Sequence, residues 1–559
     1  MEKDPRSFLN RMLFETVLEE VNGFGPFQIL ILVLLCSPRI VLPCHFLLNN
    51  FIAAIPPHHC DFKAADHDGL LSNLSEQQRL VVSLPLTEDG LPKACEMFPE
   101  AQFDLLSNGS SGSDLPTVHC SRWVYDNSTF TSTLATEFDL VCDRKSLART
   151  ASTIFFMGVM LGGIAFGFLC DKYGRKNMLL LSYALPVVFG LSSAFVTSYE
   201  MFAVLRFFTG FGLTGISIIS LVLSLEWSDT IHRSFIGVMG STAWSVGNMI
   251  LAGLAFSIRD WRHLMLAVTA PLGLALLSWW WLPESARWLL ANGKVEKARF
   301  YLNRCSKFNK GQTLSPQIQL ESFIDIKGTK KAEKTYNFLD LVRTPRIRSY
   351  TIITGIVWYG VAQTYYGISL NISGFGLSIY LTHFIYSAIE VPAKWTIFVL
   401  LNIIGRKWCQ AGTQLLTGIC IFINIFIPDS LWYVRAAIAI LGKGASEAAF
   451  TTVFLYTTEI FPTVIRQNAM GYTAFMSRLG VCISPLILLL EDVWVTLPQI
   501  ILCTGAILSG LVVLLLPETL NIHLPETIED VENPRRKGTS DGVESTEARL
   551  DSKLSPGLT

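Results

Sequence analysis

The sequence predicts an all-α membrane protein with twelve transmembrane helices in two bundles of six and a large loop between the first two helices. Three observations predict this fold: the composition, the spacing of apolar runs and an internal repeat. The chain has 559 residues, of which 50% are apolar and 16% charged, and its mean hydropathy is +0.41. Soluble proteins carry about 25% charged residues. The composition, with a net charge near −1, therefore excludes a disordered chain, a nucleic-acid binder relying on net charge and an ordinary soluble enzyme.

Long apolar runs place the helices. A helix needs about 20 mostly apolar residues to cross the hydrocarbon core, and about twelve runs meet this length. The first run is not a cleavable signal peptide, because the residues before it are charged and the run itself is too long. The predicted spans lie near residues 25–50, 148–169, 177–197, 201–224, 236–257, 263–282, 349–370, 376–403, 408–427, 432–457, 468–490 and 495–516.

The loop between the first two spans, residues 53–147, is polar and rich in cysteine and N-x-[ST] sequons. Four cysteines and three sequons in one segment predict an oxidised, glycosylated extracellular loop. The cysteines allow three disulfide pairings, which the sequence does not separate. These residues are Cys60, Cys95, Cys120 and Cys142, with sequons at Asn73, Asn108 and Asn127.

Lysine and arginine in the loops predict the orientation, because cytoplasmic loops carry an excess of both. The short loops on one side hold seven such residues, and those on the other hold three. The first side also holds the linker 283–348. The N-terminal segment 1–24, this linker and the tail 517–559 are therefore predicted to lie in the cytoplasm, and the protein itself in the plasma membrane. The two sets are Lys172, Arg175, Lys176, Arg233, Arg406, Lys407 and Arg466, against Arg259, Arg262 and Arg435.

An internal repeat relates residues 25–282 to residues 349–516. Short charged motifs recur in the same order at a nearly constant offset, each at a cytoplasmic helix end. Two similar six-helix bundles are the plan of a secondary transporter that rocks one half against the other around a site at the membrane midplane. The recurring pairs are Gly174-Arg175-Lys176 with Gly405-Arg406-Lys407, Glu226 and Arg233 with Glu459 and Arg466, and Pro283-Glu284 with Pro517-Glu518.

These charged turns have two interpretations. They can serve topology alone, or a carboxylate and a guanidinium seven residues apart can form ion pairs that hold the cytoplasmic face closed. The candidates for such a gating or structural role are Asp171, Arg175, Glu226, Arg233, Glu284, Arg287, Glu459, Arg466 and Glu518.

Two of these motifs carry a family resemblance. The segment 167–176, Gly-Phe-Leu-Cys-Asp-Lys-Tyr-Gly-Arg-Lys, resembles the G-x-x-x-D-[KR]-x-G-[KR]-[KR] signature of the major facilitator superfamily. The segment 283–290, Pro-Glu-Ser-Ala-Arg-Trp-Leu-Leu, together with Ala-Ala-Ile-Pro-Pro-His-His-Cys at 53–60, resembles the organic ion transporters of solute carrier family 22. The resemblance covers about residues 14–530 and implies a carrier of small organic ions.

Ionisable residues within the spans are candidates for the site, since a charge in a membrane helix is costly. Glu390 and Lys394 are four residues apart, as are Lys443 and Glu447. Each pair can neutralise itself along one helix face, and this structural role is as well supported as a direct role in binding.

Two arginines lack such a local partner. The helical neighbours of Arg478 are apolar or small, so an anion from elsewhere must supply the opposite charge, and a guanidinium fork suits a carboxylate or sulfonate. Arg39, between Pro38 and Pro43, is similarly isolated. Its alternative is a tertiary ion pair with a residue such as Glu447.

The resemblance implies further site residues. The segments 461–471 and 477–480 resemble helix 11 of the organic anion carriers, whose arginine falls on Arg478, and 390–394 resembles their helix 8 lysine motif, which ends on Lys394. Segments 37–48 and 446–452, the latter with Glu447, resemble the hepatic-type branch. That branch implies nucleobases, cyclic nucleotides, prostaglandins and small carboxylates as substrates. A dicarboxylate counter-anion that is exchanged for the substrate is a further candidate partner. The implied substrate-lining residues are Asn50, Tyr365, Tyr366, Phe450 and Phe454, to which position in helix 7 adds Trp358.

Other motifs do not support another function. Gly210-Phe-Gly212-Leu-Thr-Gly215 matches G-x-G-x-x-G but lies inside an apolar helix, so we interpret it as close helix packing. The sequence holds no P-loop and no zinc-ligand spacing, and we expect no ATP, cofactor, metal or nucleic acid to be involved. The competing hypotheses are a carrier of organic cations or zwitterions using Glu390 and Glu447, a non-transporting receptor or channel, and a membrane enzyme.

Overall fold

The computed structural model describes residues 17–18, 20–62, 74–87, 91–108, 115–229, 231–312, 337–371, 377–522 and 525–532. The sequon at Asn73, most of the N-terminal segment, the middle of the linker and the tail beyond residue 532 lie outside the described residues.

Twelve long helices build the part of the chain that the structure describes. Ten are long and apolar enough to cross a membrane, α21 is a shorter apolar helix of 17 residues, and α16 has 26 residues. The predicted spans are confirmed to within a few residues at each end. The helices are α2 (Pro26–Leu47), α7 (Lys145–Tyr173), α8 (Arg175–Ser192), α9 (Tyr199–Glu226), α10 (Arg233–Ser257), α11 (Trp261–Leu277), α16 (Pro345–Leu370), α17 (Ile379–Ile403), α18 (Arg406–Phe426), α19 (Trp432–Ile460), α20 (Arg466–Leu489) and α21 (Leu497–Val513).

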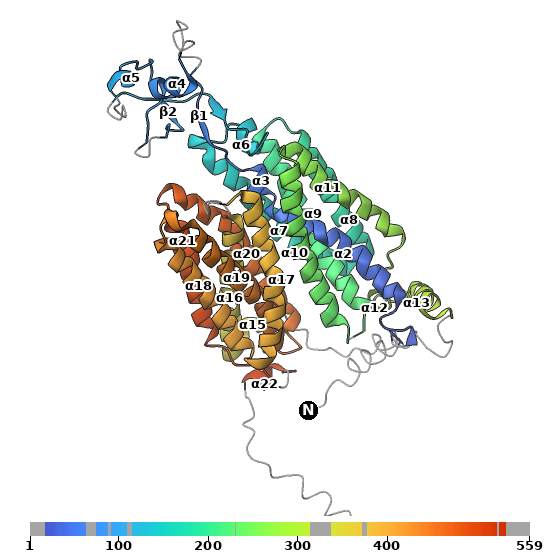
Figure 1. Ribbon diagram of the computed structural model, residues 1–559. Helices are drawn as coiled ribbons and strands as arrows, with labels where there is room; N and C mark the ends of the chain where they lie inside the picture. The colour runs from blue at the N-terminus through green and yellow to red at the C-terminus, as the bar shows by residue number, and fades with distance from the viewer. Residues whose placement is uncertain are drawn as a thin grey trace, which may run out of the picture.

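The helices form two groups, α2 with α7 to α11 and α16 to α21, which lie side by side (Figure 1). The groups meet where α7 packs against α20 and α10 against α17. The loop 53–147 projects from one end of the molecule, here called the loop end. The opposite, linker end carries α12 (Ala286–Ala291), α13 (Val295–Lys310), α15 (Asp340–Arg343) and α22 (Ile528–Glu532).

The loop has a small fold of its own. Strand β1 pairs antiparallel with β4, and β2 pairs antiparallel with β3. Disulfides join Cys60 to Cys120 and Cys95 to Cys142, with Cα–Cα distances of 5.4 and 5.7 Å, which selects one of the three pairings. The elements are α3 (Asn49–Ile52), β1 (His58–Cys60), α4 (Glu76–Ser83), β2 (Glu96–Met97), α5 (Leu105–Asn108), β3 (Val118–His119), β4 (Trp123–Tyr125) and α6 (Leu134–Glu137).

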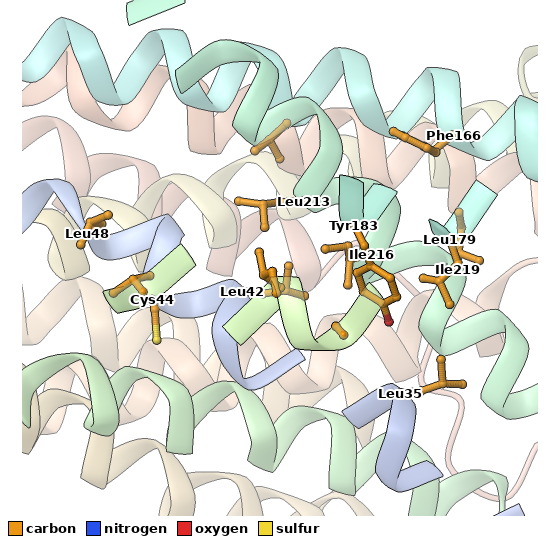
Figure 2. Close-up of a cluster of buried hydrophobic side chains, with 14 of the residues drawn as sticks. Leu35, Leu42, Cys44, Leu48, Phe166, Leu179, Tyr183, Leu213, Ile216 and Ile219 are labelled. Carbon is orange, nitrogen blue, oxygen red and sulfur yellow. The ribbon is translucent and has the colours of Figure 1, made fainter. Parts of the chain in front are cut away.

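A continuous apolar core fills the first bundle. Side chains of α2, α7, α8 and α9 lie together in this cluster (Figure 2). Apolar packing of this kind orders the helices on which the charged residues described below are mounted. The labelled core residues are Leu35, Leu42, Cys44, Leu48, Phe166, Leu179, Tyr183, Leu213, Ile216 and Ile219.

Glycines bring α7 and α9 into close contact. A Cβ atom added at Gly158 would lie 2.0 Å from the carbonyl oxygen of Phe207, and one at Gly210 would lie 2.4 Å from that of Phe155. The interpretation of Gly210, Gly212 and Gly215 as packing residues is confirmed, since an added Cβ meets a neighbouring helix at each of them. Small residues permit such close backbone approach in membrane helices.

We therefore expect Gly158→Ala to destabilise the protein by about 1–3 kcal/mol or more, because backbone atoms cannot yield to the added methyl group. Thermal unfolding of the purified protein measures the effect. Gly167→Ala on the same helix is the matched control, because an added Cβ there meets nothing within 4 Å. Equal melting temperatures for the two variants would contradict this account.

Candidate functional site

Four buried charges of α17 and α19 form one cluster in the second bundle. Lys443 Nζ lies 3.0 Å from Glu390 Oε1, and Lys394 Nζ lies 3.1 Å from Glu447 Oε1. The side chains of Lys443 and Glu390 are only 2% and 1% exposed. The predicted pairing of Glu390 with Lys394 along one helix is present, with the two charged groups 3.8 Å apart, but the shorter contacts cross between the two helices. Two acids and two lysines leave this cluster without net charge.

Hydroxyl groups form hydrogen bonds with the charged groups of the cluster. Tyr365 Oη donates to Glu390 Oε1 at 2.6 Å, and Lys443 Nζ donates to Ser369 Oγ at 2.7 Å. The Lys443 ammonium also lies 3.4 Å from the centroid of the Tyr365 ring. A buried charge is tolerated when it is paired and hydrogen-bonded in this way.

The cluster is bonded to the first bundle through α10. Lys394 Nζ donates to Ser245 Oγ at 2.7 Å and to the Ser241 carbonyl at 3.0 Å, and Ser245 Oγ donates to Glu390 Oε2 at 2.8 Å. Trp244 Nε1 donates to Tyr365 Oη at 3.1 Å. The cluster thus links the two halves as well as neutralising itself, a connection that sequence analysis missed.

Arg478 differs from the four clustered charges. Its half-buried side chain lies between the bundles, where a Cβ atom added at Gly163 of α7 would be 2.5 Å from Arg478 Cζ. Its guanidinium lies near the Tyr366 side chain of α16. No residue that the structure describes forms an ion pair or hydrogen bond with its guanidinium. The prediction that Arg478 lacks a local partner is confirmed.

Arg39 is the second guanidinium of this kind. It lies against α10, where a Cβ added at Gly240 would be 2.8 Å from its Nη1, and near the Tyr183 side chain of α8. The alternative of an ion pair between Arg39 and Glu447 was wrong, because Glu447 pairs with Lys394. Within the described ranges, Arg39 also has no acidic partner.

Aromatic rings surround this region. The Phe450 ring lies 5.4 Å from Tyr365 and 5.9 Å from Trp358, and the Tyr365 and Tyr366 rings are 5.1 Å apart. Trp358 is buried, with Nε1 donating to Thr457 Oγ1 at 2.8 Å. Phe454 contacts Trp358 edge-on but is half exposed. The structure therefore brings the predicted aromatics together, with Phe454 at the margin of the group.

The remaining helix 1 candidate bonds across the halves. Asn50 Nδ2 donates to the Ser369 carbonyl of α16 at 2.8 Å. Phe46 and Phe156 of the first bundle approach Tyr366, with ring centroids 6.4 and 5.4 Å away. Neither phenylalanine was predicted, because an apolar ring in an apolar helix gives no signal of its own.

A fifth buried cation also escaped prediction. Arg206 of α9 is fully buried, its Nη2 donates to the His45 carbonyl at 3.1 Å, and its Nη1 lies 3.3 Å from His45 Nδ1. The Phe155 ring lies 4.3 Å from its guanidinium carbon. The rule that selected Arg478, an ionisable residue inside a span, applies equally to Arg206 and would have found it.

The charged motifs at the linker end brace each half separately. Arg175 pairs with Glu226 at 3.2 Å and Arg406 with Glu459 at 3.0 Å. Arg175 begins α8 and Arg406 begins α18, so each of these pairs joins neighbouring helices of one half and does not clamp the two halves together. Asp171 also pairs with Arg175, at 2.9 Å.

Glu284 and Glu518 occupy equivalent positions in the two halves. Glu284 Oε1 accepts from the backbone N–H of Arg175 at 2.9 Å, and Glu518 Oε1 accepts from that of Arg406 at 2.9 Å, so each carboxylate caps a helix N-terminus. Burial raises the pKa of Glu284, whereas around Glu518 the backbone N–H donors outweigh burial and lower its pKa. The repeat predicted from the sequence thus has a structural counterpart.

The other predicted residues take varied places. Arg233 begins α10 and Arg287 lies in the first turn of α12, both half-buried. Arg466 begins α20 and its Nε donates to the Phe461 carbonyl at 3.2 Å. Asn127 is exposed after β4, and Asn108 ends α5.

Polar contacts between the halves lie at the middle and the loop end. Lys145 of α7 pairs with Asp492 at 2.7 Å, and Arg149 pairs with Glu491. Tyr380 Oη donates to the Thr129 carbonyl at 3.1 Å. In this conformation the loop end is therefore held together by ion pairs that join the two bundles.

Comparison with known proteins places this arrangement among transporters. The family described as "Sugar (and other) transporter" matches residues 127–530. Solute carrier family 22 member 7 of Sus scrofa is 43% identical over 532 residues, which is 93% of this chain and 96% of the relative, and that of Homo sapiens is 43% identical over 533 residues with the same coverage. Solute carrier family 22 member 6-A of Xenopus laevis is 38% identical and covers 98% of this chain and 99% of its own.

Solved structures match in fold. A D-xylose-proton symporter has a TM-score of 0.53 at 18% identity and covers 69% of this chain and 92% of its own. The inward-open xylose transporter XylE from E. coli also has a TM-score of 0.53, at 16% identity, and covers 88% of this chain and 98% of its own. These likenesses show the twelve-helix fold of the major facilitator superfamily.

Proposed function

Because the chain belongs to solute carrier family 22 of the major facilitator superfamily, and is a membrane transporter, we propose that it carries organic anions across the plasma membrane by alternating access. The observation that carries the proposal is the charge balance at the centre. Glu390 and Glu447 are each paired with a lysine, whereas Arg478 and Arg39 have no acidic partner among the described residues. The centre therefore has an excess of positive charge that an anionic substrate would neutralise.

The chemistry of Arg478 supports a carboxylate or sulfonate as the bound group. A guanidinium offers parallel N–H donors that match the two oxygens of a carboxylate. The rings of Tyr366 and Phe450 lie nearby and suit a flat, amphipathic molecule. Small carboxylates, nucleotide-like anions and prostaglandins fit this description.

The neutral cluster supports a second role, the coupling of binding to movement. Rocking of the halves must break the bonds from Ser245 and Ser241 to Lys394 and Glu390. A substrate anion near Lys394 would compete with these oxygens for the same ammonium. An exchanged dicarboxylate counter-anion would act identically from the other side of the membrane.

We place the loop end outside the cell and both termini in the cytoplasm. The excess of lysine and arginine at the linker end supports this orientation. The two disulfides and the exposed Asn127 sequon support it independently, because disulfides persist in oxidising compartments.

Uptake into cells tests the proposed function. We expect saturable uptake of a labelled aromatic carboxylate, accelerated when the cells are preloaded with unlabelled substrate, and no uptake of a labelled organic cation. Uptake of the cation without the carboxylate would contradict the proposal and favour a carrier that uses Glu390 and Glu447. Uptake that does not saturate and is not accelerated by preloading would favour a channel.

The coupling role of Ser245 gives a separate expected result. Ser245→Ala removes a hydroxyl bonded to two charged groups, which costs this conformation about 1.5–3 kcal/mol. We expect faster return of the empty carrier and therefore a smaller ratio of uptake with preloading to uptake without it. Ser257→Ala is the matched control, because Ser257 on the same helix bonds only to the Gly253 carbonyl among the residues that the structure describes. An unchanged ratio in Ser245→Ala would refute the coupling.

A further inference from the structure

Helix α13 (Val295–Lys310) lies at the linker end of the first bundle (Figure 1) and has one buried face. Val295, Ala298, Leu302 and Cys305 are buried on that face. The end of the helix is fastened to the first turn of α2: the Phe27 N–H donates to Asn309 Oδ1 at 2.9 Å, and Asn309 Nδ2 donates to Gln28 Oε1 at 2.9 Å. Helix α13 therefore has a fixed position beside α2.

That position is at the level of the membrane interface. The span of α2 begins at Pro26, one residue before the contact with Asn309. Exposed Trp280 ends the neighbouring span that contains α11, at the same end of the bundle, and exposed Trp281 follows it. Tryptophan gathers at the headgroup level of transmembrane proteins, so α13 lies where lipid headgroups are expected.

The outer face of α13 combines cations with exposed aromatic rings. At 100° per residue, Lys297, Phe300, Arg304, Lys307 and Phe308 share the face opposite the buried residues, and all five are exposed. Phe300 and Phe308 are 64% and 56% exposed. Glu296 is the only acidic residue of the helix, against five lysines and arginines. Each ring has one aromatic neighbour, Tyr301 for Phe300 and Phe27 for Phe308. More than half of each phenylalanine is still exposed among the cations, which suits an anionic lipid surface better than water.

We propose that the outer face of α13 binds the headgroups of anionic phospholipids. Lys297, Arg304 and Lys307 contact the phosphate and carboxylate groups, and the rings of Phe300 and Phe308 enter the boundary between headgroups and acyl chains. Because α13 is bonded to Phe27 and Gln28, the lipid also fixes the start of α2, the helix that carries Arg39. The inference does not depend on the identity of the transported substrate.

Reconstitution of the purified full-length protein tests this binding. We would measure the partition of spin-labelled phosphatidylserine and phosphatidylcholine to the protein surface in phosphatidylcholine nanodiscs. We expect wild type to prefer phosphatidylserine, and Lys297→Glu/Lys307→Glu to weaken that preference by about tenfold or more. Phe300→Ser, which keeps every charge, is expected to weaken it less.

Controls separate lipid recognition from misfolding and from general charge. Arg122→Glu/Arg144→Glu makes the same change of net charge at exposed positions of the loop end and is expected to retain the wild-type preference. Should the glutamate variant fail to fold, judged by its melting temperature in pure phosphatidylcholine, Lys297→Gln/Lys307→Gln takes its place. Equal binding of both lipids by wild type, or an undiminished preference in the α13 variant, would overturn the proposal. If the α13 variant lost binding of an acidic protein but kept its preference for phosphatidylserine, this result would also overturn the proposal.

Discussion

Arg478→Ala is expected to abolish measurable uptake of organic anions at normal surface expression. Truncating one partner of a hydrogen-bonded charge pair at a binding site costs about 2–5 kcal/mol, which corresponds to a loss of about thirtyfold or more in affinity. The loss should be large because Arg478 has no acidic partner in the described chain, so the substrate is its main counter-charge. Uptake of a labelled aromatic carboxylate over a range of concentrations measures the effect.

Two further variants separate charge from geometry at this position. Arg478→Lys keeps the positive charge without the planar fork, and we expect intermediate uptake. Arg144→Ala removes an exposed cation of the loop end and should leave uptake unchanged. Full uptake by Arg478→Ala would show that the substrate charge is recognised elsewhere, with Arg39 as the next candidate.

Lys443→Met is expected to give the largest loss of stability. Lys443 is fully buried, pairs with Glu390 and donates to Ser369. Removing one partner of a buried ion pair costs about 3–5 kcal/mol, because the other charge is left uncompensated. Thermal unfolding of the purified protein and its amount at the cell surface should both fall sharply.

A double variant distinguishes the ion pair from simple packing. Glu390→Gln/Lys443→Met removes both charges and should recover part of the stability that Lys443→Met loses. Lys93→Met breaks a partly exposed pair with Glu96 and should change stability by less than about 1 kcal/mol. Additive losses in the double variant would show that Lys443 and Glu390 do not stabilise each other.

The fold was predictable because its strongest determinant is local. Each span is a continuous apolar run, and its length is set by the bilayer. Helix α16 illustrates the limit of hydropathy, since buried polar residues such as Gln363 and Thr364 make it less apolar than its neighbours while its 26 residues still form one helix. The repeat was visible because Glu284 and Glu518 cap equivalent helices in the two halves.

The site was predictable only in part, because ion pairing depends on tertiary distance. Spacing along one helix suggested that Glu390 would pair with Lys394, but Lys443 on another helix lies closer to Glu390. Arg478 was found because isolation from charge is visible in the sequence. Ser245 was not, because a serine in a membrane helix gives no sign that it bonds across two halves.

The measurement that tests the central claim most directly is binding of a labelled aromatic carboxylate and of its neutral amide to the purified carrier, in wild type and in Arg478→Gln. A bidentate charge-assisted contact is worth about 3 kcal/mol, so wild type should bind the acid about a hundredfold more tightly than the amide. In Arg478→Gln this preference should nearly vanish. Equal binding of acid and amide by wild type would contradict the claim that an unpaired guanidinium selects an anionic substrate.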